Sequence, residues 1–209
     1  MSKYQIPAEI LEKYQVLKHQ IKERLFEFSQ IKPENYFYEL CYCILTPQTS
    51  AINAEKAVIR LEKAKFQTKK FDPTEILNDK SQYIRFHITK AKRLIEMKEK
   101  FDDTYKILTS NMKAELKREW LVDNIKGIGM KEASHFLRNI GNTGLAILDR
   151  HILKHLVLCN IYKDLPKVST KKDYLAVEKK FKEFAKKVQI PMDELDLLFW
   201  SYETGKILK

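Results

Sequence analysis

The sequence predicts an all-α protein, and three observations lead to this prediction. Apolar residues recur at spacings of three and four along most of the chain, and few segments alternate polar with apolar residues. The 209 residues include only five glycines and six prolines. Spacings of three and four place side chains on one face of a helix, whereas a half-buried strand needs alternation. With few glycines and prolines to interrupt the pattern, we expect a mostly helical chain.

The first third of the chain is expected to contain three helices. The first carries one long apolar stripe, formed by Ile10, Tyr14, Leu17, Ile21, Leu25 and Phe28. Lys32-Pro33 ends this pattern, and the segment 36–45 is apolar on nearly all sides, as in a buried helix. The segment 46–50 interrupts the pattern again, and Ser50 can cap a third helix. The apolar face of that helix consists of Ala54, Ala57, Val58 and Leu61.

The middle of the chain is expected to hold a short helix and a basic helix. Asp72-Pro73 begins the short one, with Asp72 at the cap and Pro73 at the first helical position. The tripeptide Arg85-Phe86-His87 is basic, aromatic and expected to be non-helical. A basic helix follows from Thr89 and contains Lys90, Lys92 and Arg93.

The segment 122–134, Val-Asp-Asn-Ile-Lys-Gly-Ile-Gly-Met-Lys-Glu-Ala-Ser, joins two helical patterns. The incoming pattern contains Leu116, Trp120 and Leu121, and the outgoing one Ala133, Phe136, Leu137 and Ile140. Between them, Gly127 and Gly129 permit positive φ and a close approach of another backbone. Two helices joined in this way form a helix-hairpin-helix. The amides of its glycine turn lie at a helix N-terminus, where partial positive charge suits a phosphate.

The last third is expected to hold three more helices. Gly141 and Gly144 frame a loop, and Asp149 begins a helix with Ile152, Leu153 and Leu156 on its apolar face. A linker spans residues 163–167. The next helix has a stripe of Val177, Phe181, Phe184 and Val188, and the last, after Pro191, has one of Leu195, Leu198, Phe199 and Tyr202.

The charge balance favours a polyanionic partner. Lys and Arg number 39 against 28 Asp and Glu, so the net charge is +11, and the isoelectric point is near 9.4. A lysine-rich surface is also common in heat-adapted proteins, and charge alone does not separate the two interpretations. The glycine hairpin favours nucleic acid.

The cysteines argue against a disulfide framework and against an iron–sulfur cluster. There are three, Cys41, Cys43 and Cys159, without CxxC spacing, and a typical cluster needs four thiolates. Residues 1–7 have no apolar signal core, and no apolar run approaches the ~18 residues of a membrane span. We therefore expect a soluble protein in a reducing, cytoplasmic setting.

Lys131 and Asp149 are the candidate catalytic pair. Lys131 stands in the first turn after the glycine hairpin, and Asp149 follows 18 positions later in Leu148-Asp149-Arg150-His151. This constellation resembles the helix-hairpin-helix superfamily of DNA glycosylases, in the branch whose lysine also cleaves the strand. The resemblance implies that the Lys131 amine forms a Schiff base with a sugar and that Asp149 stabilises the charge that builds there. Alternatively, Lys131 only contacts phosphate and Asp149 only caps a helix.

The same resemblance implies how DNA is held. Gly127 and Gly129 would bind phosphate through their amides, with Lys126 and Arg150 nearby. Many relatives place proline where this chain has Lys126. A monovalent cation, K⁺ or Na⁺, would be held by the backbone carbonyls of Asp123, Ile125 and Ile128.

Two further segments are candidates for contacts with a distorted duplex. Gln48 resembles the loop glutamine that relatives insert where a nucleotide has been flipped out, although it could be an ordinary turn residue. Arg85, Phe86 and His87 could reach the base opposite the lesion, with Phe86 stacking. Alternatively, Phe86 fills the core between two helices.

The ending Phe199-Trp200-Ser201-Tyr202-Glu203-Thr204-Gly205-Lys206-Ile207-Leu208-Lys209 looks like that of the type 2 8-oxoguanine DNA glycosylases of archaea and some bacteria. These short enzymes lack a cluster and stop at a lysine implicated in telling 8-oxoguanine from guanine. 8-Oxoguanine has an N7–H donor that guanine lacks, so an acceptor at Lys209 would favour the lesion. Trp200 could stack on the flipped base or pack in the core.

The resemblance implies two helical subdomains flanking a DNA-binding cleft. Residues 34–146 would form a helical barrel with the hairpin, and residues 1–33 plus 147–209 a second subdomain. We expect a monomeric 8-oxoguanine DNA glycosylase/AP lyase acting on double-stranded DNA, without a catalytic metal or cluster. The alternatives are a relative that excises oxidised pyrimidines and a non-catalytic helix-hairpin-helix DNA-binding module.

Overall fold

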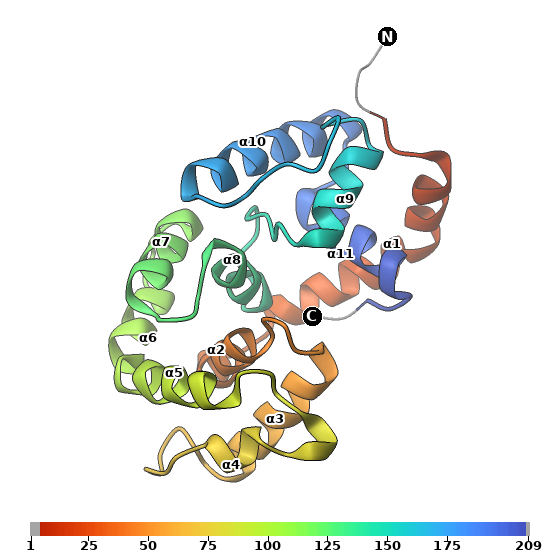
Figure 1. The fold of residues 1–209 in the computed structure, drawn as a ribbon. Helices are drawn as coiled ribbons and strands as arrows, with labels where there is room; N and C mark the ends of the chain where they lie inside the picture. Colours follow the sequence, from red (N-terminus) through yellow and green to blue (C-terminus); the bar gives the residue numbers. More distant parts are fainter. Residues whose placement is uncertain (1–4, 208–209) are drawn as a thin grey trace. The chain divides into compact units, whose positions relative to one another are not determined.

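The computed structural model describes residues 5–207, and within them every regular element is a helix (Figure 1). The all-α prediction is therefore confirmed. The helices are α1 Ala8–Ser29, η1 Pro33–Asn35, α2 Tyr36–Leu45, α3 Ala51–Lys63, α4 Thr74–Leu77, η2 Lys80–Gln82, α5 His87–Glu99, α6 Phe101–Thr109, α7 Ala114–Asn124, α8 Met130–Asn139, α9 Arg150–Leu158, α10 Lys171–Val188 and α11 Met192–Thr204. No helix of the described part is long and apolar enough to cross a membrane.

Contacts divide the chain into two compact units. One, here called the hairpin unit, comprises residues 31–136, and the other, the terminal unit, comprises residues 1–30 and 137–209. The family resemblance predicted the second boundary at residue 146, whereas the contacts place it at residue 136, inside α8. The residues after it contact the terminal unit, because Arg138 pairs with Asp196 at 3.0 Å and Gly141 lies against Ser29.

The hairpin unit is organised around α2. As predicted, α2 is a buried helix, and Cys41 and Cys43 are among its core side chains. Helices α3 and α5 pack against it. Ser50 caps α3 as predicted, since its side chain accepts from the Asn53 amide at 3.1 Å. The predicted hairpin is present as α7, a short turn and α8.

The terminal unit packs α1 and α9 against α11. The predicted stripe of α1 is buried at Ile10, Tyr14, Ile21 and Phe28, whereas Leu17 and Leu25 are partly exposed. α11 is buried along most of its length, including three carboxylates at its start. One of these, Glu194, accepts a hydrogen bond from the buried Tyr14 hydroxyl at 2.6 Å, which ties α1 to α11.

Three local predictions need correction. The cap of α4 is Pro73 rather than Asp72, although Asp72 accepts from the Thr74 amide. His87 is the first residue of α5, so the predicted non-helical tripeptide ends at Phe86. Leu116 is 51% exposed, because α7 buries Lys117, Arg118 and Leu121 instead. Periodicity misses this face because two of its three buried members, Lys117 and Arg118, are charged.

Candidate functional site

The turn between α7 and α8 requires glycine at one position. Gly127 has φ +89°, and a Cβ built there would lie 2.5 Å from Cδ of Arg93. Gly129 has no positive φ, and its nearest obstacle would be the flexible end of Glu132 at 3.2 Å. The Ile128 amide donates to the Ile125 carbonyl at 3.2 Å and closes the turn. Gly127 therefore fixes the shape of the hairpin.

Side chains from α5 and its end support the turn. Lys100 donates to the carbonyl of Asn124, the last residue of α7, at 3.0 Å. Lys126 pairs with Glu96 of α5 at 3.0 Å and is 73% exposed. Its ammonium is thus near the hairpin and accessible to an anion.

Lys131 lies in the first turn of α8 as predicted, and its neighbour Glu132 is a residue that the sequence did not single out. The Lys131 ammonium is 3.0 Å from one oxygen of Glu132, and the other oxygen accepts from the Gly129 amide at 3.3 Å. The Lys131 side chain is one-third exposed. The Gly129 amide, which the sequence analysis assigned to a phosphate, therefore donates to a carboxylate in this structure. An anion is expected at a helix N-terminus.

Asp149 is the predicted cap of α9. One of its oxygens accepts from the amides of His151 and Ile152 at 2.8 and 2.9 Å. Its capping role is therefore present, and a chemical role is compatible with it because the carboxylate has a second oxygen. Asp149 remains partly exposed.

The segment 145–148, which leads to Asp149, is buried and held by polar side chains of α10. The Ala146 amide donates to Glu178 at 3.0 Å, and the Leu148 amide donates to the Tyr174 hydroxyl at 3.2 Å. That hydroxyl donates in turn to the Ala146 carbonyl at 2.6 Å. These hydrogen bonds satisfy buried backbone groups in a segment that lacks regular structure. They therefore hold in place the stretch of chain that leads to Asp149.

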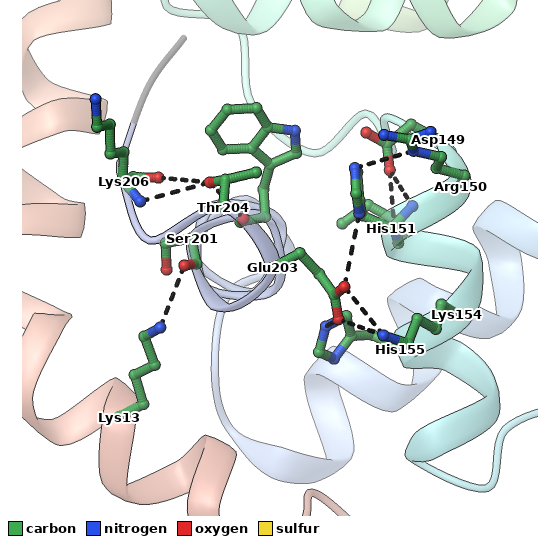
Figure 2. Close-up of polar contacts among 12 residues, drawn as sticks. Lys13, Asp149, Arg150, His151, Lys154, His155, Ser201, Glu203, Thr204 and Lys206 are labelled. Carbon is green, nitrogen blue, oxygen red and sulfur yellow. Dashed lines mark hydrogen bonds and ion pairs between the residues drawn. The ribbon is translucent and has the colours of Figure 1, made fainter.

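A second cluster in the terminal unit joins α9 to α11 around Glu203 (Figure 2). Glu203 accepts from Lys154 at 2.8 Å, lies 3.1 Å from Nε2 of His155, and is 3.9 Å from Nδ1 of His151. Hydrogen bonding to Lys154 lowers the pKa of Glu203. His155 is fully buried and stacks on Phe199, and burial lowers its pKa.

Arg150 is exposed beside this cluster. Its guanidinium Nε donates to Nε2 of His151 at 3.2 Å, and Figure 2 shows the pair next to Asp149. On α11, burial raises the pKa of Asp196 to about 7, against the pull of Arg138, and the charge of Asp149 acts in the same direction as burial.

The two loops of the hairpin unit with predicted contacts to a distorted duplex each contain a left-handed residue. Gln48, between α2 and α3, has φ +56°, and Phe86, before α5, has φ +60°. Phe86 is 51% exposed, with the Arg85 guanidinium 4.9 Å from its ring centre. The alternative that Phe86 fills the core is therefore wrong. His87 is partly exposed and contacts Tyr83 edge to face.

The end of α11 carries the predicted base-recognition residues. Trp200 is partly exposed, and its carbonyl accepts from Thr204 at 2.9 Å. Lys13 of α1 donates to the Ser201 carbonyl at 3.2 Å, and Gly205 ends the helix with φ +73° (Figure 2). Lys209 lies outside the described residues.

The structure groups the predicted residues by unit. The hairpin unit contains Gln48, Arg85, Phe86, His87, Asp123, Ile125, Lys126, Gly127, Ile128, Gly129 and Lys131, and the terminal unit contains Asp149, Arg150 and Trp200. The pairing of Lys131 with Asp149 stays a prediction. The sequence analysis gave no role to Glu132 or Glu203, and the partner of Glu203 is distant in sequence.

Comparisons with known proteins show the family of the chain. Residues 21–190 match the family model Ogg-HhH, described as 8-oxoguanine DNA glycosylase. A Fusobacterium nucleatum protein named 8-oxoguanine DNA glycosylase/AP lyase is 42% identical, with all of both chains covered. A Methanocaldococcus jannaschii protein of the same name is 37% identical, covering 92% of this chain and 93% of the relative.

Solved structures show the same likeness. The M. jannaschii 8-oxoguanine glycosylase/lyase in complex with a 15mer DNA containing 8-oxoguanine superposes with a TM-score of 0.84 at 34% identity, covering 96% of this chain and 100% of that one. The 8-oxoguanine DNA glycosylase of Thermotoga maritima superposes with a TM-score of 0.84 at 30% identity, covering 96% and 97%. The chain belongs to the helix-hairpin-helix family of 8-oxoguanine DNA glycosylases.

Proposed function

We propose that this chain is a bifunctional enzyme that excises 8-oxoguanine from double-stranded DNA and then cleaves the strand. The observation that carries the proposal is a lysine in the first turn of α8, directly after a glycine turn, in a chain that belongs to this family. A non-catalytic hairpin module has no need of that lysine or of Asp149. The family assignment and the names of its relatives also support this substrate over oxidised pyrimidines.

Lys131 is the proposed nucleophile. Its neutral amine attacks C1′ of the damaged nucleotide, the C1′–N9 bond breaks, and the base leaves with that electron pair and takes up a proton. Opening of the sugar ring gives an imine between Nζ and C1′. Loss of a C2′ proton then expels the 3′ phosphate, and the strand is cleaved by β-elimination. Glu132 must release Lys131 before attack, since the amine cannot be both an ion-pair partner and a nucleophile.

Asp149 is proposed to stabilise the positive charge that develops on the sugar as the base leaves. The carboxylate accepts hydrogen bonds from two amides, and the buried segment 145–148 holds the chain before it, so the carboxylate is preorganised. Such preorganisation is the main source of electrostatic catalysis. Asp149 can also assist the proton transfers.

The hairpin is the proposed phosphate-binding site, with Lys126 and Arg150 as further cationic contacts. A K⁺ or Na⁺ ion at the carbonyls of Asp123, Ile125 and Ile128 would add positive charge there. The Ile125 carbonyl also accepts from the Ile128 amide, and a carbonyl oxygen has a second lone pair that could bind an ion. Exchange of K⁺ for a bulky cation at fixed ionic strength should therefore weaken DNA affinity. An unchanged affinity would mean that the amides and Lys126 bind the phosphate without an ion.

Recognition of the lesion is proposed to use Trp200 as a stacking surface and Lys209 as the source of an acceptor for N7–H. An acceptor held there would face no donor on guanine and remain unpaired. Deletion of Lys209 should lower discrimination against guanine more than it lowers DNA affinity. Unchanged discrimination would refute this part of the proposal.

The test of the function is a panel of duplexes that each carry one lesion, combined with borohydride trapping. We expect excision of 8-oxoguanine, strand cleavage, and a covalent adduct. Lys131→Gln should keep DNA binding and abolish both cleavage and adduct. Excision confined to oxidised pyrimidines would give the activity to the related class, and an adduct that persists in Lys131→Gln would rule out Lys131 as the nucleophile. We further propose a monomeric, intracellular enzyme, which sedimentation and cell fractionation test.

A further inference from the structure

Lys90 of α5 is a fully buried lysine that the sequence analysis placed only in a basic helix. Its side chain is 2% exposed. The ammonium donates to the Leu45 carbonyl at 2.6 Å, the Pro47 carbonyl at 2.7 Å and the Thr49 hydroxyl at 2.9 Å. An ammonium has three donors, and all three are used within five consecutive residues, from Leu45 at the end of α2 to Thr49 in the loop that follows.

The loop that Lys90 holds contains Gln48 in a left-handed conformation. Its φ of +56° is uncommon for a residue with a side chain and persists only where the surroundings hold it. Two of the three acceptors flank Gln48 directly, on Pro47 and Thr49. The Thr49 amide also donates to the Thr46 carbonyl at 2.9 Å, which closes the turn. The Gln48 side chain is thereby presented to solvent.

The same residue contacts the second left-handed residue through its backbone. The Lys90 amide donates at 2.9 Å to the carbonyl of Phe86, which has φ +60° and is half exposed. This bond is the first main-chain hydrogen bond of α5, which any non-proline residue at position 90 would make, so the Lys90 side chain itself holds only the Gln48 loop. Both loops belong to the hairpin unit.

Opposing effects act on the pKa of the Lys90 ammonium. Burial and the nearby Arg93 lower its pKa to about 8, while three accepting oxygens favour the charged form. A buried cation is costly, and an apolar side chain would fill the space without that cost. Its retention is explained if the loop needs a donor at three points.

We infer that Lys90 is a positioning residue whose side chain holds the Gln48 loop in the shape required to enter the duplex at the flipped nucleotide. This inference rests on the proposed function. Lys90 is not proposed to touch DNA. It acts through Gln48, so loss of its side chain should affect the flipped state more than the initial binding of undamaged duplex.

Lys98 gives a matched control on the same helix. It donates to the carbonyls of Phe66 and Lys69, both at 2.6 Å, and burial also lowers its pKa. Lys90→Met and Lys98→Met therefore remove the same kind of contact from two different loops. Fluorescence of 2-aminopurine beside an abasic-site analogue reports entry into the duplex. Single-turnover excision of 8-oxoguanine and affinity for undamaged duplex are measured in parallel.

We expect Lys90→Met to lower the excision rate and the duplex-entry signal about tenfold or more, as for loss of one charge-assisted contact, with affinity for undamaged duplex within about threefold. Lys98→Met should change none of these. Lys90→Arg should restore part of the signal. Equal behaviour of the two Met variants, both folded by circular dichroism, would overturn the inference.

Two further measurements keep the test decisive. If Lys90→Met does not fold, Thr49→Val removes one acceptor at lower risk, and it should reduce the duplex-entry signal, whereas an unchanged signal counts against Lys90. In a Gln48→Ala background the Lys90→Met effect should shrink, and full additivity would contradict action through that loop. A duplex-entry signal that depends on Lys90 without excision of 8-oxoguanine would instead refute the proposed substrate.

Discussion

The hairpin and the segment around Asp149 place their candidate catalytic groups by different means. In the hairpin, a glycine turn sets the backbone, and the Lys131 side chain has one adjacent carboxylate and is one-third exposed. Around Asp149, the preceding segment is buried and its amides are bonded to Glu178 and Tyr174, while the carboxylate itself is bonded to two amides. The lysine can therefore move, whereas the aspartate is held.

The difference agrees with the proposed chemistry of each group. A nucleophile travels toward the carbon that it attacks and then stays bonded to it, so its side chain must be able to leave its resting partner. A charge-stabilising carboxylate works best when it does not reorganise during the reaction. Changes at Asp149 should therefore affect rate without loss of fold, and changes at the glycine turn should affect fold as well as binding.

The largest effect is expected when the Asp149 carboxylate becomes an amide. Asn is as good a helix cap as Asp, so Asp149→Asn should change unfolding free energy by no more than about 0.5 kcal/mol. The excision rate should fall about 10²–10³-fold, as for loss of a preorganised electrostatic group. Single-turnover excision and chemical denaturation measure the two quantities.

Asp149→Ala is the matched control, because it removes both the cap and the charge. It should lose about 1 kcal/mol of stability in addition to the rate. If Asp149→Asn excises 8-oxoguanine at the wild-type rate, Asp149 is a cap alone.

At the hairpin, comparison of Gly127→Ala with Gly129→Ala separates the effect of the backbone conformation from the effect of losing a glycine. Gly127→Ala puts a Cβ at positive φ and 2.5 Å from Arg93, and it should cost about 1–3 kcal/mol of stability together with phosphate affinity. Gly129→Ala meets only the movable end of Glu132 and should cost less than about 1 kcal/mol. Thermal unfolding and duplex binding measure both, and equal losses would argue against a special backbone at Gly127.

The sequence predicts the helices because their stripes are local. The apolar segment 36–45, the cap at Ser50 and the cap at Asp149 all follow from residues within a few positions, and all are present. α7 shows where this reasoning fails. Its buried face includes Lys117 and Arg118, which donate hydrogen bonds to the Leu108 carbonyl and the Ser134 hydroxyl. A polar residue that finds a partner elsewhere in the chain looks exposed in a one-dimensional pattern.

The candidate site divides in the same way. Gly127, Lys131 and Asp149 are visible because a family motif places them within about thirty residues of each other. Lys90 and Glu203 cannot be singled out from the sequence, because the side-chain partners of Lys90 lie 41–45 positions away and the hydrogen-bond partners of Glu203, Lys154 and His155, lie 49 and 48 positions away. One available signal for Lys90 was its place at the start of a helix directly after the exposed Arg85-Phe86-His87 segment.

A smaller effect is expected from Glu203, which joins α9 to α11. Glu203→Gln removes the charge facing Lys154 and His155, and it should cost about 0.5–1 kcal/mol because the ion pair is partly exposed. Glu183→Gln on the exposed side of α10 is the control and should be neutral. Denaturation at two salt concentrations tests the cause, since the Glu203 difference should shrink as salt screens the pair. Equal stability of both variants would mean that Glu203 does not hold the two helices together.

The smallest effect concerns the pH dependence of stability through His155. Burial lowers its pKa below the ordinary 6.5, so the unfolded chain takes up a proton at higher pH than the folded one. The stability from a neutral His155 is therefore complete above about pH 6.5 and is lost as pH falls through the window below it.

Asp196 changes stability in the opposite sense across the same window, because burial raises its pKa to about 7. The quantity to measure is therefore the difference between wild type and His155→Gln, by denaturation at pH 5.0 and pH 7.5. That difference should favour the wild type more at pH 7.5 than at pH 5.0. A His155→Gln profile parallel to that of the wild type would mean that Glu203 compensates the charged imidazolium fully, which would make the cluster an ion pair that tolerates either state of His155.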